Sequence, residues 1–169
     1  MQAINITDVS DLGRYGVKGP EASNWLARHK VALPTTANTW LLSENTIVMR
    51  LGSSEFLIED QKGGETCAKL AADSLHVAGV YKVPRVDASY LLAGSRITNL
   101  LSELCALDLR ELALQDNGVV MTQVAGISAT ILRQSLNGEN VYRLWCDGTY
   151  GTFMTVSYTH LRAHETEAD

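Results

Sequence analysis

The chain has 169 residues, of which 46% are hydrophobic and 20% are charged, and its formal net charge is −5 at pH 7. This composition fits one globular domain and excludes a disordered, collagen-like or coiled-coil chain. No apolar run approaches the ~18–20 residues that span a bilayer, the N-terminus lacks the pattern of a signal peptide, and the acidic balance argues against nucleic-acid and membrane partners.

The first half of the chain predicts strands, a helix, three strands and a second helix. A short strand at 4–6 leads into a segment rich in glycine at 11–20, whose turns flank another short strand. Pro20 suits the first turn of a helix that runs to about His29 and has Ala22, Trp25 and Leu26 on its apolar face. The remaining predicted elements are strands at 40–42, 46–51 and 56–60 and a helix at 65–76.

The second half repeats this order. It predicts a strand at 83–92, a helix at 95–104 with Ser95 as N-cap, strands at 119–124, 127–133 and 141–147, and a helix from Thr152. Asn137-Gly138 is a strong signal for a hairpin. Segment 19–22 corresponds to 94–97, and segment 55–60 to 142–147.

We therefore interpret the chain as a diverged duplication in a single domain, 1–155, with halves of about 1–80 and 81–155. The expected fold class is α+β: two β-α-β-β-β halves with antiparallel sheets and with helices packed on one face.

The last residues differ from the rest in pattern. Residues 156–166 read Val-Ser-Tyr-Thr-His-Leu-Arg-Ala-His-Glu-Thr and resemble a translated adapter used in sequencing libraries. We expect native coding to end near residue 155 and treat 156–169 as a non-native tail. Its deletion should then leave stability unchanged, and we reject His160 and His164 as a metal site.

The sequence nominates no catalytic residue and no metal ligand. Cys67, Cys105 and Cys146 are sparse and lie in no CxxC, so we interpret them as small core residues of a protein from a reducing, cytoplasmic compartment. His29 and His76 fall near predicted helix ends, and no orienting carboxylate is evident for either.

The most distinctive segment is 142–151. Arg143, Trp145 and Asp147 alternate with apolar residues, which gives one strand face a mixed aromatic and charged character. This face could be an ordinary exposed sheet face, or an interface with a partner, where Trp, Tyr and Arg are enriched. Trp145 could also be a core residue. The candidate contact or ligand residues are Trp145, Asp147, Tyr150 and Arg143, followed by Arg14 and Tyr15.

Five segments together carry a resemblance to a known family. They are Asp11–Ala22, Leu51–Ile58, Asp87–Gly94, Cys105–Arg110 and Tyr142–Tyr150. In order and spacing they resemble the gamma subunits of heterotetrameric sarcosine oxidases, within the wider group of aminomethyltransferase-like folate-binding proteins. The resemblance covers nearly all of residues 11–154. The Lys-Gly-Cys-x-x-Gly-Gln signature of related iron–sulfur maintenance proteins is absent around Cys105 and Cys146.

The resemblance implies the fold of the glycine-cleavage T protein. It implies a complex that oxidises sarcosine to glycine and transfers the one-carbon unit to tetrahydrofolate. FAD, FMN, NAD and tetrahydrofolate would be used on the larger partner subunits, and this chain would be a small non-catalytic subunit that binds none of them.

Two other interpretations stay open. One is a free-standing small folate-binding or one-carbon transfer protein, for which Trp145, Asp147 and Arg143 supply an aromatic slot, a carboxylate and an arginine. The other is a helper domain without a link to one-carbon chemistry.

Overall fold

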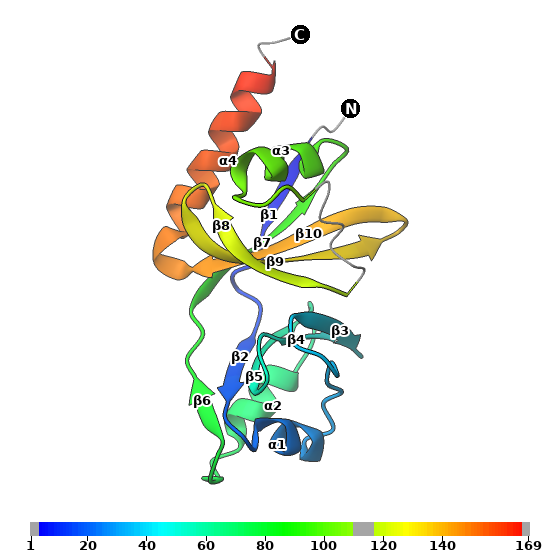
Figure 1. Ribbon diagram of the computed structural model, residues 1–169, viewed down its shortest axis with the longest axis vertical. Coiled ribbons are helices and arrows are strands. Elements are labelled where there is room, and N and C mark those ends of the chain that lie inside the picture. Colours follow the sequence, from blue (N-terminus) through cyan, green and yellow to red (C-terminus); the bar gives the residue numbers. More distant parts are fainter. Residues whose placement is uncertain (1–3, 110–116, 167–169) are drawn as a thin grey trace. The chain divides into compact units, whose positions relative to one another are not determined.

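The computed structural model describes residues 4–109 and 117–166. The chain forms two compact units, each with one antiparallel sheet (Figure 1). Unit 1 comprises residues 1–10, 87–116 and 120–169, and unit 2 comprises residues 11–86 and 117–119. In the part of the chain that the structure describes, no helix is both long and apolar enough to cross a membrane.

The sheet of unit 2 has the strand order β3-β4-β5-β2-β6. Its strands are β2 (Arg14–Lys18), β3 (Thr39–Ser43), β4 (Thr46–Arg50), β5 (Glu55–Asp60) and β6 (Tyr81–Val83). Two helices, α1 (Ala22–Arg28) and α2 (Thr66–Ala72), cover one face of this sheet. Val17, Trp25, Phe56, Ile58 and Leu70 are members of the core between the helices and the sheet.

The sheet of unit 1 has the strand order β1-β7-β10-β9-β8. Its strands are β1 (Asn5–Asp8), β7 (Asp87–Ala93), β8 (Val119–Val124), β9 (Ile127–Leu136) and β10 (Glu139–Asp147). Its helices are α3 (Ile97–Leu104), the single-turn η1 (Gly148–Tyr150) and α4 (Gly151–Thr166). Tyr90, Leu92, Leu101, Leu144 and Met154 are members of the core that α3 and α4 form with the sheet.

The two units repeat one arrangement, as the sequence predicts. Each contains β-α-β-β-β and a trailing helix, and the strands β2, β5, β4, β3 occur in the same spatial order as β7, β10, β9, β8. The turn before the first helix is also the same. Gly19 and Gly94 have φ of 123° and 118°, and each carbonyl accepts the N–H of the first helical residue, Ala22 or Ile97. At Gly19 a Cβ would lie 2.2 Å from the Gly79 carbonyl oxygen, so this turn requires glycine.

The edge strands are exchanged between the repeats. β1 precedes β2 in the chain, but it pairs with β7 in the other sheet. β6 precedes β7, but it pairs with β2. Ser10 fastens the end of β1, because its Oγ accepts the Ser89 N–H at 2.9 Å, and the neighbouring Val9 N–H donates to the Ser89 carbonyl at 2.8 Å. The compact units therefore differ from the sequence halves 1–80 and 81–155 in the placement of their first strands.

Three details of the sequence analysis were wrong. Ser95 is not the N-cap of α3, because the helix begins at Ile97 and its N-cap is Arg96, without a side-chain cap hydrogen bond. The predicted strand 83–92 is two strands, β6 and β7, interrupted at Pro84, which has no N–H to donate. The alignment of 55–60 with 142–147 was displaced by one residue. Val17 and Leu92 are equivalent, because each lies two residues before the glycine of its turn, and their cross-strand partners are Phe56 and Tyr142. The residue equivalent to Tyr142 is therefore Phe56. Because side chains alternate between faces, the displaced alignment exchanged the two faces of the strand.

Helix α4 continues across residue 155, the expected end of the native sequence. Met154 and Tyr158 lie in the core of unit 1, and Tyr158 is only 1% exposed. The expectation that residues from 156 onward do not pack on the domain is therefore wrong at Tyr158. The resemblance of 156–166 to an adapter concerns the origin of the segment and stays a prediction.

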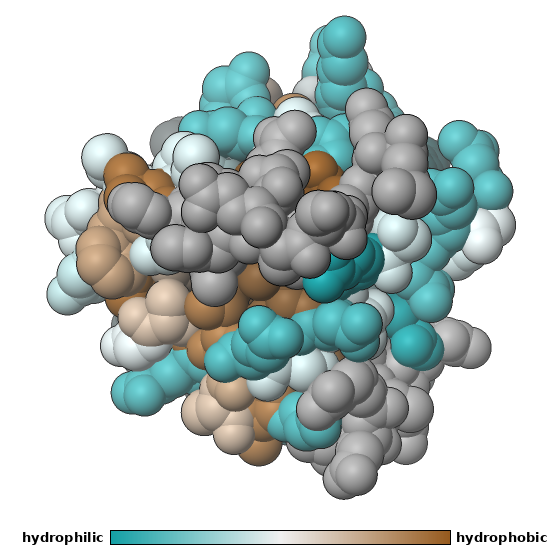
Figure 2. Space-filling model, turned by 90° about the horizontal axis from the view of Figure 1, so that it is seen from above, coloured by the Kyte–Doolittle hydropathy of each residue, from teal (hydrophilic) through white to brown (hydrophobic). Residues whose placement is uncertain are grey.

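The opposite side of α4 is apolar and exposed. Phe153 and Val156 are exposed there, and Tyr150 of η1 is exposed just before the helix. Figure 2 shows one face of the molecule, on which brown apolar surface lies at the centre and the left among teal hydrophilic side chains. Scattered apolar residues of this kind are common on globular proteins.

We predict that Tyr158→Ala lowers the free energy of unfolding by about 3–5 kcal/mol, because it empties a buried aromatic site. Tyr158→Phe should cost nothing, since the buried hydroxyl has no hydrogen-bond partner among the described residues. Urea unfolding followed by circular dichroism measures both. Phe153→Ala, at an exposed site on the same helix, is the control and should change stability by at most about 0.5 kcal/mol. Equal effects of Tyr158→Ala and Phe153→Ala would contradict the packing of Tyr158.

Candidate functional site

The six residues singled out from the sequence do not form one surface. Trp145 is 1% exposed, and Arg143, Arg14 and Tyr15 are also buried. Only Asp147 and Tyr150 reach the surface. The four buried residues therefore cannot form an exposed aromatic and charged surface.

The reason is that β10 is buried on both faces. Tyr142, Leu144 and Cys146 point toward the helices of unit 1. Arg143 and Trp145 alternate with them and so lie on the opposite face, here called the far face. The Arg143 Nε donates to Gln134 Oε1 at 3.1 Å. The prediction of an exposed mixed face was wrong, because it assumed that only one face of this sheet is covered.

Asp147 has a local structural role. Its Oδ1 accepts the backbone N–H of Thr149 at 2.8 Å and the Thr149 hydroxyl at 2.6 Å, which caps η1. These donors hold the pKa of Asp147 below its usual value. Tyr150 follows in η1 and is half exposed, so it remains a candidate for contact with a partner.

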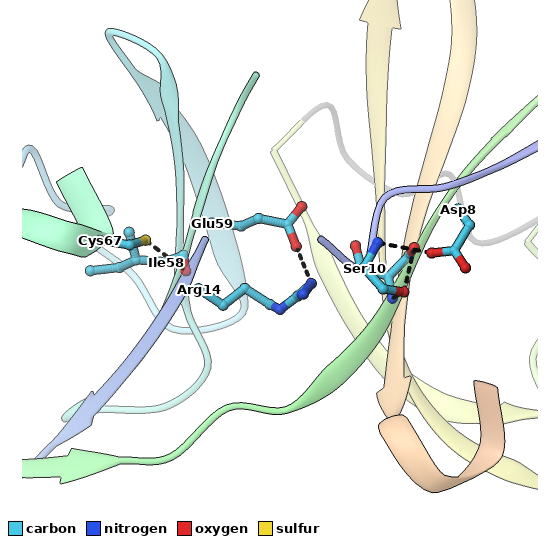
Figure 3. A network of polar contacts seen from close by, with 7 residues as sticks. Asp8, Ser10, Arg14, Ile58, Glu59 and Cys67 are labelled. Carbon is cyan, nitrogen blue, oxygen red and sulfur yellow. Dashed lines mark hydrogen bonds and ion pairs between the residues drawn. The ribbon is translucent and has the colours of Figure 1, made fainter. Parts of the chain in front are cut away.

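The far face of the sheet in unit 2 carries a buried ion pair. Arg14 on β2 and Glu59 on β5 are paired in register, and Arg14 Nη1 lies 3.1 Å from Glu59 Oε2. Figure 3 shows the two side chains pointing toward one another. Both side chains are almost fully buried. A buried pair of this kind needs both partners, because either charge alone would be costly to bury.

Tyr15 points to the other side of β2, where a cluster of aromatic and titratable side chains lies. Its ring stacks on Trp25 with a centroid distance of 6.0 Å, and Trp25 contacts His29 edge-on at 4.6 Å. Asp73 Oδ2 accepts from Trp25 Nε1 at 3.3 Å and lies 2.8 Å from His29 Nε2. Leu75 N–H donates to the other oxygen of Asp73 at 2.9 Å. Asp73 is the orienting carboxylate that the sequence analysis did not find for His29.

A pocket of about 300 Å³ adjoins His29. Lys30 and Lys69 line it together with the hydroxyls of Thr46 and Thr66, and Glu44 is the acidic residue of its rim. A histidine held by a carboxylate beside lysines and hydroxyls is suited to binding a small anion. Lys69 also lies 3.6 Å from the Glu65 carboxylate. This is the site in the described chain with the clearest chemical character.

The wall of this pocket is fixed by a buried carboxylate. Asp60 accepts the N–H groups of Thr66 at 3.2 Å and Cys67 at 2.9 Å at the start of α2, and the Thr46 hydroxyl lies 3.0 Å from it. Burial raises the pKa of the Cys67 thiol to about 12, and the charge of Asp60 adds to this. Cys67 is therefore a poor nucleophile and acts as a small core residue, as predicted.

The other two cysteines are also free thiols, of which Cys146 is buried and Cys105 partly buried. Burial raises the pKa of each to about 11. Within the described residues, no group of three or more His, Cys, Asp and Glu side chains is placed to hold a metal ion.

No family model matches this sequence, and no curated protein matches it. Solved structures do match. A heterotetrameric sarcosine oxidase from Corynebacterium sp. U-96, in complex with pyrrole 2-carboxylate, contains a chain with a TM-score of 0.66 and 18% identity; the match covers 87% of this chain and 77% of that chain. The glycine cleavage system aminomethyltransferase T from Bartonella henselae matches with a TM-score of 0.63 and 17% identity, over 90% of this chain and 44% of that chain.

These likenesses show the fold. The protein has the α+β fold shared by these two structures, with two antiparallel five-stranded sheets, as the sequence resemblance implied. It spans less than half the length of the aminomethyltransferase.

We predict that Arg14→Met lowers the free energy of unfolding by about 3–5 kcal/mol, because it removes the ion pair between Arg14 Nη1 and the buried Glu59 carboxylate. The double variant Arg14→Met with Glu59→Met should recover most of this loss. Chemical denaturation measures both. A double variant as unstable as Arg14→Met alone would mean that the pair is not the cause.

We also predict an acid-dependent contribution from Asp73. The Leu75 N–H and the His29 side chain lower its pKa, so its stabilisation is present above the unfolded value of about 3.9 and is lost as the pH falls through the lower folded value. Urea unfolding at several pH values, followed by tryptophan emission, measures this. Asp73→Asn should lose this part of the acid dependence, whereas Asp11→Asn, at an exposed carboxylate, should keep it. Identical pH profiles for both variants would contradict the prediction.

Proposed function

We propose that this chain is a small, gamma-type subunit of a sarcosine oxidase-like complex, which oxidises sarcosine to glycine and transfers the one-carbon unit to tetrahydrofolate. The observation that carries the proposal is the likeness to a chain of a heterotetrameric sarcosine oxidase. The match covers similar shares of both chains, 87% and 77%, so the two chains are of similar length. A small chain of such an assembly is thus a better comparison than the longer aminomethyltransferase.

The placement of the polar residues supports a structural role for the far faces. Arg14 pairs with Glu59, and Arg143 donates to Gln134, so these arginines take part in the packing of the chain itself.

We propose that the larger subunits carry FAD, FMN, NAD and tetrahydrofolate and the catalytic residues. This chain would bind those subunits as a non-catalytic partner. The free thiols of the three cysteines support a reducing, cytoplasmic location.

A free-standing folate-binding or one-carbon transfer protein is the second candidate. The likeness to aminomethyltransferase T favours it. However, the folate slot expected from Trp145, Asp147 and Arg143 does not fit the structure, because Trp145 and Arg143 are buried while Asp147 caps η1 at the surface. A folate in this chain would need other residues. The pocket beside His29, with Lys30 and Lys69, is suited to a carboxylate.

The test is co-expression with the two flavin-binding subunits of a sarcosine oxidase from the same source. We expect this chain to co-purify with them and to co-elute in size-exclusion chromatography at the mass of the complex. Purified alone, it should be colourless, without a flavin absorption band, and without sarcosine oxidation. A tight complex with tetrahydrofolate and no association with the large subunits would favour the second candidate instead.

A further inference from the structure

The three most exposed large apolar side chains of the described residues lie in one stretch of unit 2. Among the large hydrophobic residues of the described chain, the largest exposed fractions belong to Val86 at 83%, Leu75 at 75% and Tyr81 at 55%. Leu75 and Tyr81 line the same pocket, so they are neighbours in space. Neighbouring exposed apolar side chains mark interaction sites more reliably than single ones do.

This pocket has a volume of about 310 Å³, and its lining includes the aromatic residues Trp25 and Tyr81. Trp25, which is buried, contributes to its wall together with Val80, and Leu75 and Tyr81 stand at its exposed side. Trp25 is held in place by Tyr15 and Asp73. The pocket is therefore preformed and large enough for one aliphatic or aromatic side chain.

The pocket lies beside an open edge of the sheet. Tyr81 belongs to β6, which pairs with β2 on one side and is the last strand in the order of the described sheet. Figure 1 shows β6 at the margin of this sheet next to β2. An edge strand offers unpaired backbone N–H and C=O groups, to which an extended segment of another chain can add as a further strand.

One side of the pocket carries the positive charge of Lys82, although the chain as a whole is acidic. His76 and Lys82 line the pocket. The Lys82 ammonium donates to the Asp73 carbonyl oxygen at 2.6 Å, which holds it in position. Lys18 is opposite Tyr81 in the β2–β6 register and is exposed. The nearby carboxylate of Glu21 already accepts from Asn24 at 2.9 Å.

We propose that β6 and the pocket of Trp25, Leu75 and Tyr81 bind an extended segment of a larger partner subunit. This segment adds to the edge of the sheet, places one aliphatic or aromatic side chain in the pocket, and carries carboxylates that face His76 and Lys82. The inference rests on the proposed function, since it names the surface through which this chain would join the complex.

The test uses the full chain co-expressed with the large subunits. Leu75→Glu and Lys82→Glu introduce negative charge at the pocket and should each weaken binding at least tenfold, which corresponds to about 1.4 kcal/mol. Leu42→Glu is the matched control, because Leu42 is 50% exposed on β3, the opposite edge strand of the same sheet. It should bind within about twofold of wild type, as expected for a site outside the interface.

Two further measurements keep the test decisive. Thermal melts of the free Leu75→Glu and Leu42→Glu variants should match wild type, because these side chains are exposed. Lys82→Glu also loses the bond to the Asp73 carbonyl, so Tyr81→Ala replaces it if it melts early. Hydrogen exchange of the complex should show the backbone amides of 81–83 protected relative to the free chain. Equal binding by Leu75→Glu, Lys82→Glu and Leu42→Glu, or unprotected amides in 81–83, would overturn the docking surface while leaving the proposed function intact. Failure of wild type itself to bind the large subunits would overturn both.

Discussion

The pairing of β1 with β7 and of β6 with β2 is the constraint on which the architecture depends. Each strand lies before its own repeat in the chain but completes the sheet of the other repeat. Neither pairing is long, since β6 contributes three residues and β1 four. The contacts between Ser10 and the backbone of Ser89 strengthen the β1 side at the point where the chain leaves the strand. Compact units therefore cannot be assigned by cutting the sequence at its midpoint.

The second constraint is that the central strands β5 and β10 are buried on their far faces as well as beneath the helices. In unit 2, Ile47, Met49 and Leu57 share that face with Arg14 and Glu59, and all five are buried. Apolar residues there gain from removal from water, and polar residues must find partners within the chain. The surface available for ligands and partners is thus shifted to sheet edges, helix ends and the turns beside them.

Sequence reasoning succeeded where the signal is local. The glycines at 19 and 94 and the apolar spacing after them predicted two equivalent helices, because a left-handed turn followed by a helical pattern depends on a few adjacent residues. Alternation along β10 correctly separated its two faces, but it could not tell that both are covered. The burial of Trp145 depends on tertiary packing, which no local period records.

The candidate site was missed for a similar reason. His29 and Asp73 are 44 residues apart in sequence, and only the folded chain brings them to 2.8 Å. The available signal was weak: His29 falls at the end of a predicted helix, whereas Asp73 was placed inside the predicted helix 65–76, and α2 in fact ends at Ala72 with Asp73 as its C-cap. At Tyr158 the error came from composition, because a break in apolar pattern was taken to mean an unpacked segment, whereas one aromatic residue at helical spacing from Met154 is enough to extend a core.

The exchanged strands also bear on how such a protein could arise. A single copy of the repeat, such as residues 1–80 alone, would carry a first strand that has no place in its own sheet. Two identical copies could complete their sheets by exchanging that strand, as in a domain-swapped dimer. Gene fusion would turn this dimer into one chain, and the residues at the two equivalent edges could then change independently. The two repeats share this pattern of strand pairing but differ in the residues it carries: Arg14 pairs with Glu59 in one half, and Ser89 lies opposite Trp145 at the equivalent positions of the other.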